Sequence, residues 1–134
     1  MDHTAQREQL AMCLRFGATP LPCDSHSKVG ISRSVQTGIQ PINGLRVKAE
    51  GDVSGWYLWG GCEFSEDPEF FVPLHVEHLT AWCPAVVQYL QLPTGWRFLI
   101  GPGYEGVWFD PELASREATL GDHSPPKSFS DAES

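Results

Sequence analysis

The sequence predicts an α+β fold, with a small antiparallel sheet flanked by helices in a single domain. Helix-like and strand-like segments alternate in mixed order and include at least one hairpin, which is typical of that class. The chain has 134 residues, the size of one domain. Its composition, 41% hydrophobic and 19% charged, is globular. We expect the domain to span residues 1–118 and the Gly-, Ser- and Pro-rich residues 119–134 to form a disordered acidic tail.

The first element is predicted to be an amphipathic helix from Thr4 to Phe16. Leu10, Cys13 and Leu14 fall at helical spacing and predict the buried face. Residues 29–35 alternate between apolar and small residues, which predicts a strand with one buried face.

Turn residues dominate the next segment, residues 36–52, for which we expect a long ordered loop. Residues 55–60, Gly-Trp-Tyr-Leu-Trp-Gly, are aromatic and bounded by glycine, and they predict a strand. Residues 65–69, with a proline and several acids, indicate a helix start. Apolar residues at helical spacing then predict a helix over residues 74–83.

The last elements are a hairpin and a short helix. Residues 96–100 and 107–109 predict its two strands. Trp96, Phe98, Trp108 and Phe109 are the aromatic residues of this hairpin, and we assign all four to the core. Asp110 precedes Pro111 and is expected to cap a helix that runs to about residue 118.

Charge is distributed unevenly along the chain. The net charge is −8; residues 1–48 carry +3, residues 49–112 carry −9, and residues 113–134 carry −2. An acidic centre disfavours nucleic acid, whose phosphates require clustered Lys and Arg. It favours a basic partner. Arg97 is the only cation in the acidic segment, and we expect it to form a structural ion pair with Glu105 or Asp110.

No apolar run approaches the length of a membrane span, and the first residues lack the apolar stretch of a signal peptide. We therefore expect a cytoplasmic protein that does not contact membranes. Its four cysteines, without a C-x-x-C pair, are expected to be reduced. No catalytic or cofactor-binding motif is present, so we expect neither an enzyme nor a bound cofactor.

One alternative is a metal-binding or hydrolytic protein. His75 and His78 are three residues apart on a predicted helix, with Glu77 between them, and Cys62 or Cys83 could complete a zinc site. The spacing is not His-Glu-x-x-His and there is no second pair of ligands, so these histidines are weak metal candidates.

The aromatic strand leaves three roles open. Trp56 and Trp59 point to opposite faces of a regular strand, and Tyr57 shares the side of Trp59. Helices could cover both faces, or one face could bind a protein partner, since Trp and Tyr dominate interface hot spots. A small-ligand module that uses the Trp56–Trp59 surface is the third role.

Four motifs in series resemble a known family. They are Gly-Trp-Tyr-Leu-Trp-Gly at residues 55–60, Asp-Pro-Glu-Phe-Phe-Val-Pro-Leu-His-Val-Glu-His-Leu at 67–79, Tyr-Leu-Gln-Leu-Pro-Thr-Gly-Trp-Arg-Phe-Leu at 89–99, and Tyr-Glu-Gly-Val-Trp-Phe-Asp at 104–110. Together they resemble bacterial immunity protein family thirty-three, formerly a domain of unknown function. The likeness spans about residues 29–113.

The resemblance implies a cytoplasmic immunity protein of a polymorphic toxin system, which binds and occludes a cognate toxin without turnover. It implies no catalytic residue. We predict that acids and two aromatic residues form the partner-binding site. These candidates are Trp59, Glu63, Glu66, Asp67, Glu69, Glu77, Tyr104 and Glu105.

Overall fold

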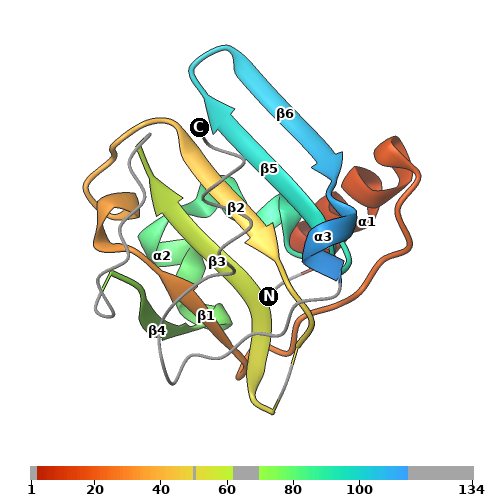
Figure 1. Ribbon diagram of the computed structural model, residues 1–134, viewed down its shortest axis with the longest axis horizontal. Helices are drawn as coiled ribbons and strands as arrows, with labels where there is room; N and C mark the ends of the chain where they lie inside the picture. The colour runs from red at the N-terminus through yellow and green to blue at the C-terminus, as the bar shows by residue number, and fades with distance from the viewer. Residues whose placement is uncertain (1–2, 50, 62–69, 115–134) are drawn as a thin grey trace.

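A computed structural model describes residues 3–49, 51–61 and 70–114, which form one six-stranded sheet in the order β4-β1-β3-β2-β5-β6 (Figure 1). The elements are α1 (His3–Phe16), β1 (Lys28–Ile31), the 3-10 segment η1 (Arg33–Val35), β2 (Ile42–Arg46), β3 (Val53–Gly60), β4 (Val72–His75), η2 (Val76–His78), α2 (Leu79–Trp82), η3 (Pro84–Tyr89), β5 (Trp96–Gly101), β6 (Tyr104–Phe109) and α3 (Pro111–Ala114). The α+β class is confirmed. The sheet is mixed rather than antiparallel, because β1 and β3 pair in parallel.

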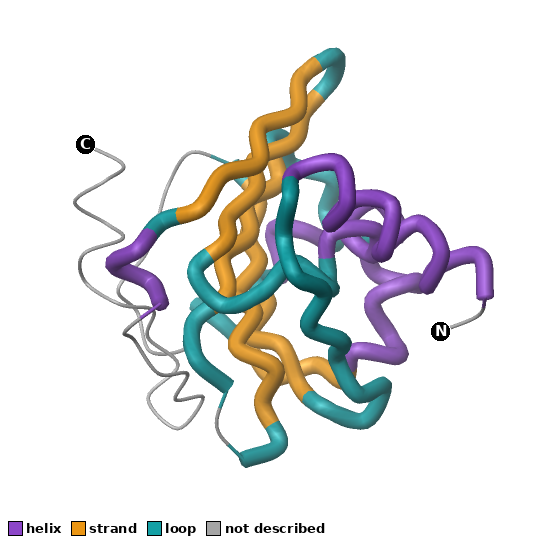
Figure 2. The backbone as a smooth tube through the Cα atoms, turned by 90° about the vertical axis from the view of Figure 1, so that its right-hand side faces the viewer, coloured by secondary structure: helices purple, strands orange, loops and turns teal. Residues whose placement is uncertain are grey.

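Each face of the sheet has its own apolar layer. Figure 2 shows α1 and the 3-10 segments on one side and α3 on the other. On the side of α1, Phe98 lies between Trp56 and Tyr89, with ring centroids 5.6 Å and 4.4 Å away. On the other side, Tyr57 and Trp59 pack edge-on against Phe71. Burial of large aromatic rings on both faces explains why Trp56 points to one side of β3 and Tyr57 and Trp59 to the other.

Strand β2 occupies a segment for which a long loop was predicted. All five of its residues are buried, and it pairs with both β3 and β5 at the centre of the sheet. The Asn43-Gly44 pair, a turn signal in sequence, lies within this strand. Glycine is required there because a Cβ on Gly44 would overlap the ring of Phe98. Close ring packing thus overrides the local turn preference.

Helix α1 is confirmed, but its predicted buried face is wrong. Leu10 and Leu14 are 49% and 84% exposed. Gln9, Met12 and Cys13 are buried instead. The helix turns a partly polar face inward because Gln9 has buried hydrogen-bond partners there, the carbonyl of Val87 among them.

The predicted helix over residues 74–83 is also wrong in its first part. Strand β4 pairs antiparallel with β1, and helical structure begins only at Val76. Val76 and Leu79 are buried, as their spacing predicted, but they lie in the 3-10 segment η2 and the short helix α2. The predicted helix start at residues 65–69 and the tail at 119–134 lie outside the described residues.

The buried side chain of Arg46 on β2 links the sheet to the segment before β1 and the segment before β5. Arg46 is 2% exposed and lies 5.7 Å from the ring of Trp56. Its guanidinium donates to the carbonyls of Ser54, Leu21, Leu90 and Leu92 over 2.7–3.1 Å. Carbonyl oxygens thus accept hydrogen bonds from the buried guanidinium and offset part of the cost of burying it. Burial still lowers the pKa of Arg46.

Candidate functional site

In the part of the chain that the structure describes, the exposed aromatic residues gather on β6, the last strand of the sheet. Tyr104, Trp108 and Phe109 are 51%, 39% and 49% exposed. Tyr104 and Trp108 alternate along the strand and share one face, and Phe109 points to the opposite face. Figure 2 shows the β5–β6 hairpin extending beyond the layers on either side of the sheet. We call Tyr104, Gly106 and Trp108 the aromatic strip.

The central residue of the strip is a glycine. Gly106 has no side chain, and a Cβ built there would lie 2.9 Å from the Tyr104 hydroxyl and 3.5 Å from the Trp108 ring. The two aromatic side chains therefore lean towards each other over bare backbone. A Cβ at this position would displace the Tyr104 hydroxyl and make ordinary contact with the Trp108 ring, so glycine leaves room for Tyr104 to lie over the strand.

These exposures correct the assignment of the whole hairpin to the core. Phe98 is 1% exposed and Trp96 packs against the same cluster, as predicted. Trp108 and Phe109 are instead surface residues. The alternating pattern of β6 indicated two distinct faces, but strand order decides whether an outer face is covered, and the sequence does not reveal that β6 ends the sheet.

The base of the hairpin is fixed by Arg97. Its Nη1 lies 3.3 Å from Oδ2 of Asp110, which confirms one of the two ion pairs expected for this arginine. The guanidinium also lies 5.2 Å from the centroid of the Trp108 ring. Asp110 accepts from the backbone N–H of Glu112 at 3.1 Å, which confirms its role as the cap of α3. One carboxylate therefore holds both the hairpin and the helix that follows.

Glu105 connects the hairpin to the helical layer. Its carboxylate lies 2.8 Å from Nη1 of Arg15 on α1 and accepts a 2.5 Å hydrogen bond from the Tyr89 hydroxyl. Burial and this hydrogen bond to a negative group together raise the pKa of Tyr89. Because its carboxylate is held on two sides, Glu105 positions the strip rather than presenting a free charge. Its contact with a partner stays a prediction.

The other predicted site residues do not gather around this strip. Trp59 is 1% exposed, so its expected role as a surface anchor is wrong; Trp56, equally buried, rules out the Trp56–Trp59 ligand surface. Glu77 lies 3.6 Å from His26 and 3.8 Å from His78, next to β4, at the opposite edge of the sheet from β6. The acids Glu63, Glu66, Asp67 and Glu69 lie outside the described residues.

The metal hypothesis gains no support from the geometry. The rings of His75 and His78 are 6.1 Å apart, centroid to centroid. Over residues 3–49, 51–61 and 70–114, no group of three or more His, Cys, Asp or Glu side chains could hold an ion. In the same part of the chain, no helix is long and apolar enough to cross a bilayer.

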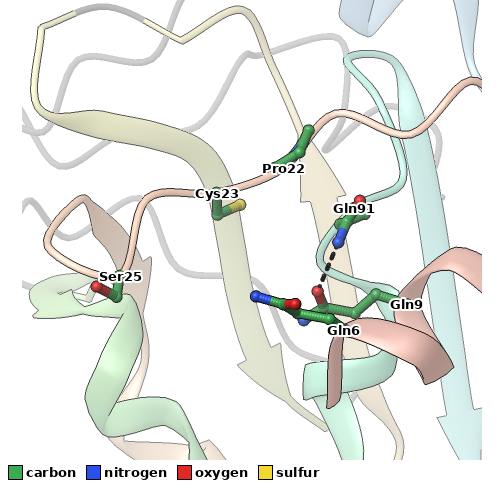
Figure 3. Close-up of a pocket in the computed structure, with 6 residues that line it drawn as sticks. All are labelled: Gln6, Gln9, Pro22, Cys23, Ser25 and Gln91. Atoms are coloured by element: carbon green, nitrogen blue, oxygen red, sulfur yellow. Dashed lines mark hydrogen bonds between the residues drawn. The ribbon is translucent and has the colours of Figure 1, made fainter. Parts of the chain in front are cut away.

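A small polar pocket lies between α1 and the segment before β1 (Figure 3). Its volume is about 180 Å³, and Gln9, Gln91 and Cys23 are among its lining residues. Gln91 donates to Oε1 of Gln9 at 2.9 Å, while the Cys23 thiol donates to the Leu90 carbonyl at 3.3 Å. Burial raises the pKa of Cys23, which keeps the thiol protonated and unsuited to nucleophilic attack.

An apolar hollow lies beside the turn of the hairpin. It has a volume of about 280 Å³, and its lining includes Ile42, Ile100 and Pro102. It opens on the face of the sheet opposite the aromatic strip, because Ile100 and Tyr104 occupy different faces of the β5–β6 pair. The hairpin therefore has apolar surface on both sides.

The described residues thus define a small α+β domain whose most distinctive surface is an exposed aromatic strand at the edge of its sheet. The chain belongs to the Imm33-like family: the model of the Imm33-like domain matches residues 8–110. The match extends from α1 to the end of the hairpin, with all six strands inside it. No curated protein and no solved structure matched the chain.

Proposed function

We propose that this chain is a cytoplasmic immunity protein that neutralises a cognate bacterial toxin by binding it stoichiometrically. The family supports an immunity role in general terms. The aromatic strip on β6 carries the specific proposal, because exposed Tyr and Trp on a fixed backbone are typical of protein-binding hot spots.

The strip suits a protein partner better than a small molecule. Tyr104 and Trp108 lie on an open strand rather than in a concave pocket, which is where small ligands bind. Arg97 contacts the Trp108 ring on the face of the strip, and Glu105 ties the strand to α1 on the other face, so the strand loses little freedom when a partner covers it. Rigid, exposed aromatic area favours a protein surface.

Charge supports a basic toxin. Residues 49–112 carry −9, and the whole chain carries −8. Long-range attraction of a basic protein accelerates association, whereas the aromatic contacts hold the complex together. Inhibition by this route requires no chemistry from the immunity protein: a toxin covered at or near its active site is inactive for as long as the complex lasts.

The proposal is tested by co-expression with the toxin encoded by the neighbouring gene. The wild-type chain should restore growth and co-purify with the toxin at a 1:1 ratio. Replacing both Tyr104 and Trp108 with alanine should weaken binding by about 100-fold or more, as expected when two hot-spot residues are lost.

The matched control is Leu21→Ala. Leu21 is also an exposed hydrophobic residue, 40% exposed, but it lies outside the sheet. It should bind like the wild type. A double variant that folds normally and still protects cells with unchanged affinity would place the toxin site elsewhere on the chain.

A further inference from the structure

The outer side of β6 has no strand partner within residues 3–49, 51–61 and 70–114. Natural sheets protect such edges with proline, lysine, bulges or very short strands. Strand β6 has six residues, contains neither proline nor lysine, and pairs with β5 without a register shift. Among the described residues, nothing protects this edge.

The hydrogen-bond pattern identifies which main-chain groups are free. The Asp110 N–H donates to the Gly95 carbonyl, and residues 101 and 104 close the two-residue turn. Bonding alternates along an antiparallel pair, so Tyr104, Gly106 and Trp108 bond to β5. The N–H and C=O groups of Glu105, Val107 and Phe109 therefore point outward.

We propose that β6 binds the toxin by strand addition, pairing its outward main-chain groups with an extended segment of that protein. The inference rests on the proposed function and gives it a geometry. The added segment would form backbone hydrogen bonds at three positions of β6. Its side chains on one face would cover Tyr104 and Trp108, and those on the other would meet Val107 and Phe109.

Side chains and charge indicate the chemistry of the occupant. Apolar surface lies on both faces of β6. The added segment should therefore present apolar side chains on both of its faces. A second copy of this chain would bring together two proteins of charge −8, which repel each other. A basic toxin is attracted instead.

The test is amide hydrogen exchange by NMR, with the purified chain alone and in its complex with the co-expressed toxin. The amides of residues 105, 107 and 109 should exchange freely in the isolated chain and become protected by 10-fold or more in the complex. The amides of 104, 106 and 108 are already bonded to β5 and should change little by comparison.

Three outcomes are decisive against strand addition. If the toxin binds and the amides of 105, 107 and 109 stay unprotected, strand addition is wrong while the proposed function stands. If these amides are protected in the isolated chain in proportion to its concentration, a second copy occupies the edge. If no toxin binds at all, the proposed function fails with it.

A substitution provides an independent test. Val107→Pro removes one outward N–H, and it breaks no hydrogen bond to β5. Val107→Ala is the matched control, since it trims the same half-buried side chain and retains the N–H. Relative to the alanine variant, the proline variant should bind the toxin about tenfold more weakly, the value of one hydrogen bond. Equal affinity of two folded variants would overturn the proposal.

Discussion

The two edges of the sheet, β4 and β6, differ in almost every property that controls strand pairing. Strand β4 has four residues, with Pro73 at the second position, and it leads directly into a 3-10 turn. Strand β6 has six residues, no proline and three exposed aromatic side chains. A short strand with a proline resists further pairing, whereas a longer regular strand invites it.

The inner faces of the two edges are alike in their packing. Leu74 of β4 and Val107 of β6 are both half-buried and pack against the main core, so the inner face of each edge contributes to stability. Tyr104 and Trp108 of β6 lie on the outer part of the sheet, held there by polar contacts of Arg97 and Glu105. We infer that the fold closes one edge and keeps the other available.

The largest effect is expected from Arg46, a buried residue of the central strand β2. Arg46→Met would remove the guanidinium donor from the carbonyls of Leu21, Ser54 and Leu92. The Leu90 carbonyl would lose it too, but it would still accept from Trp56 and Cys23. We expect unfolding in urea to show a loss of about 3–5 kcal/mol, with both edges losing protection together. A loss confined to one edge would mean that the halves of the sheet unfold independently.

A smaller effect, specific to β6, is expected from Arg97→Ala. The change removes the ion pair with Asp110 and the contact with the Trp108 ring. Because both side chains of the pair are largely buried, we expect a loss of about 2 kcal/mol and a lower melting temperature. Hydrogen exchange should rise at β6 and stay unchanged at β4; an unchanged melting temperature would show that the pair is unimportant.

The smallest effect concerns Tyr89 and alkaline pH. The folded pKa of Tyr89 is raised above its unfolded value of 10.0, so the folded state holds the phenolic proton more tightly. Its contribution is complete below pH 10 and declines as pH rises through and beyond that value. Tyr89→Phe should cost about 1–2 kcal/mol at neutral pH.

Denaturation curves recorded from pH 8 to pH 11 provide the comparison. Wild-type stability should fall more steeply above pH 10 than that of the phenylalanine variant. Parallel curves for the two proteins would show that the hydrogen bond from Tyr89 to Glu105 does not stabilise the folded state. Another contact would then hold β6 against the helical layer.

The sequence predicted local structure well where patterning and packing agree. Helix α1, strand β3 and the β5–β6 hairpin were all located, as was the Arg97–Asp110 pair. It failed at β2 because Gly44 reads as a turn residue until the ring of Phe98, more than fifty positions later, is placed against it. Local propensity contains no information on such a contact.

The candidate site was only half predictable. Tyr104 was expected at the surface and is there, but Trp108 was assigned to the core because large aromatic residues are usually buried. Whether the face of a strand is covered depends on strand order, a property of the whole chain. For the same reason, Trp59 was expected at the surface but is buried against Phe71.

The central place of β2 has a consequence for synthesis of the protein. Its partner β5 pairs Ile100 with Ile42, so the middle of the sheet cannot close until the ribosome has produced the last part of the domain. At ~5–20 residues per second, the ~60 residues between them take several seconds to make. During that interval Trp56 lacks the ring of Phe98 that covers it. The nascent chain must therefore remain soluble while part of its future core is still exposed to solvent.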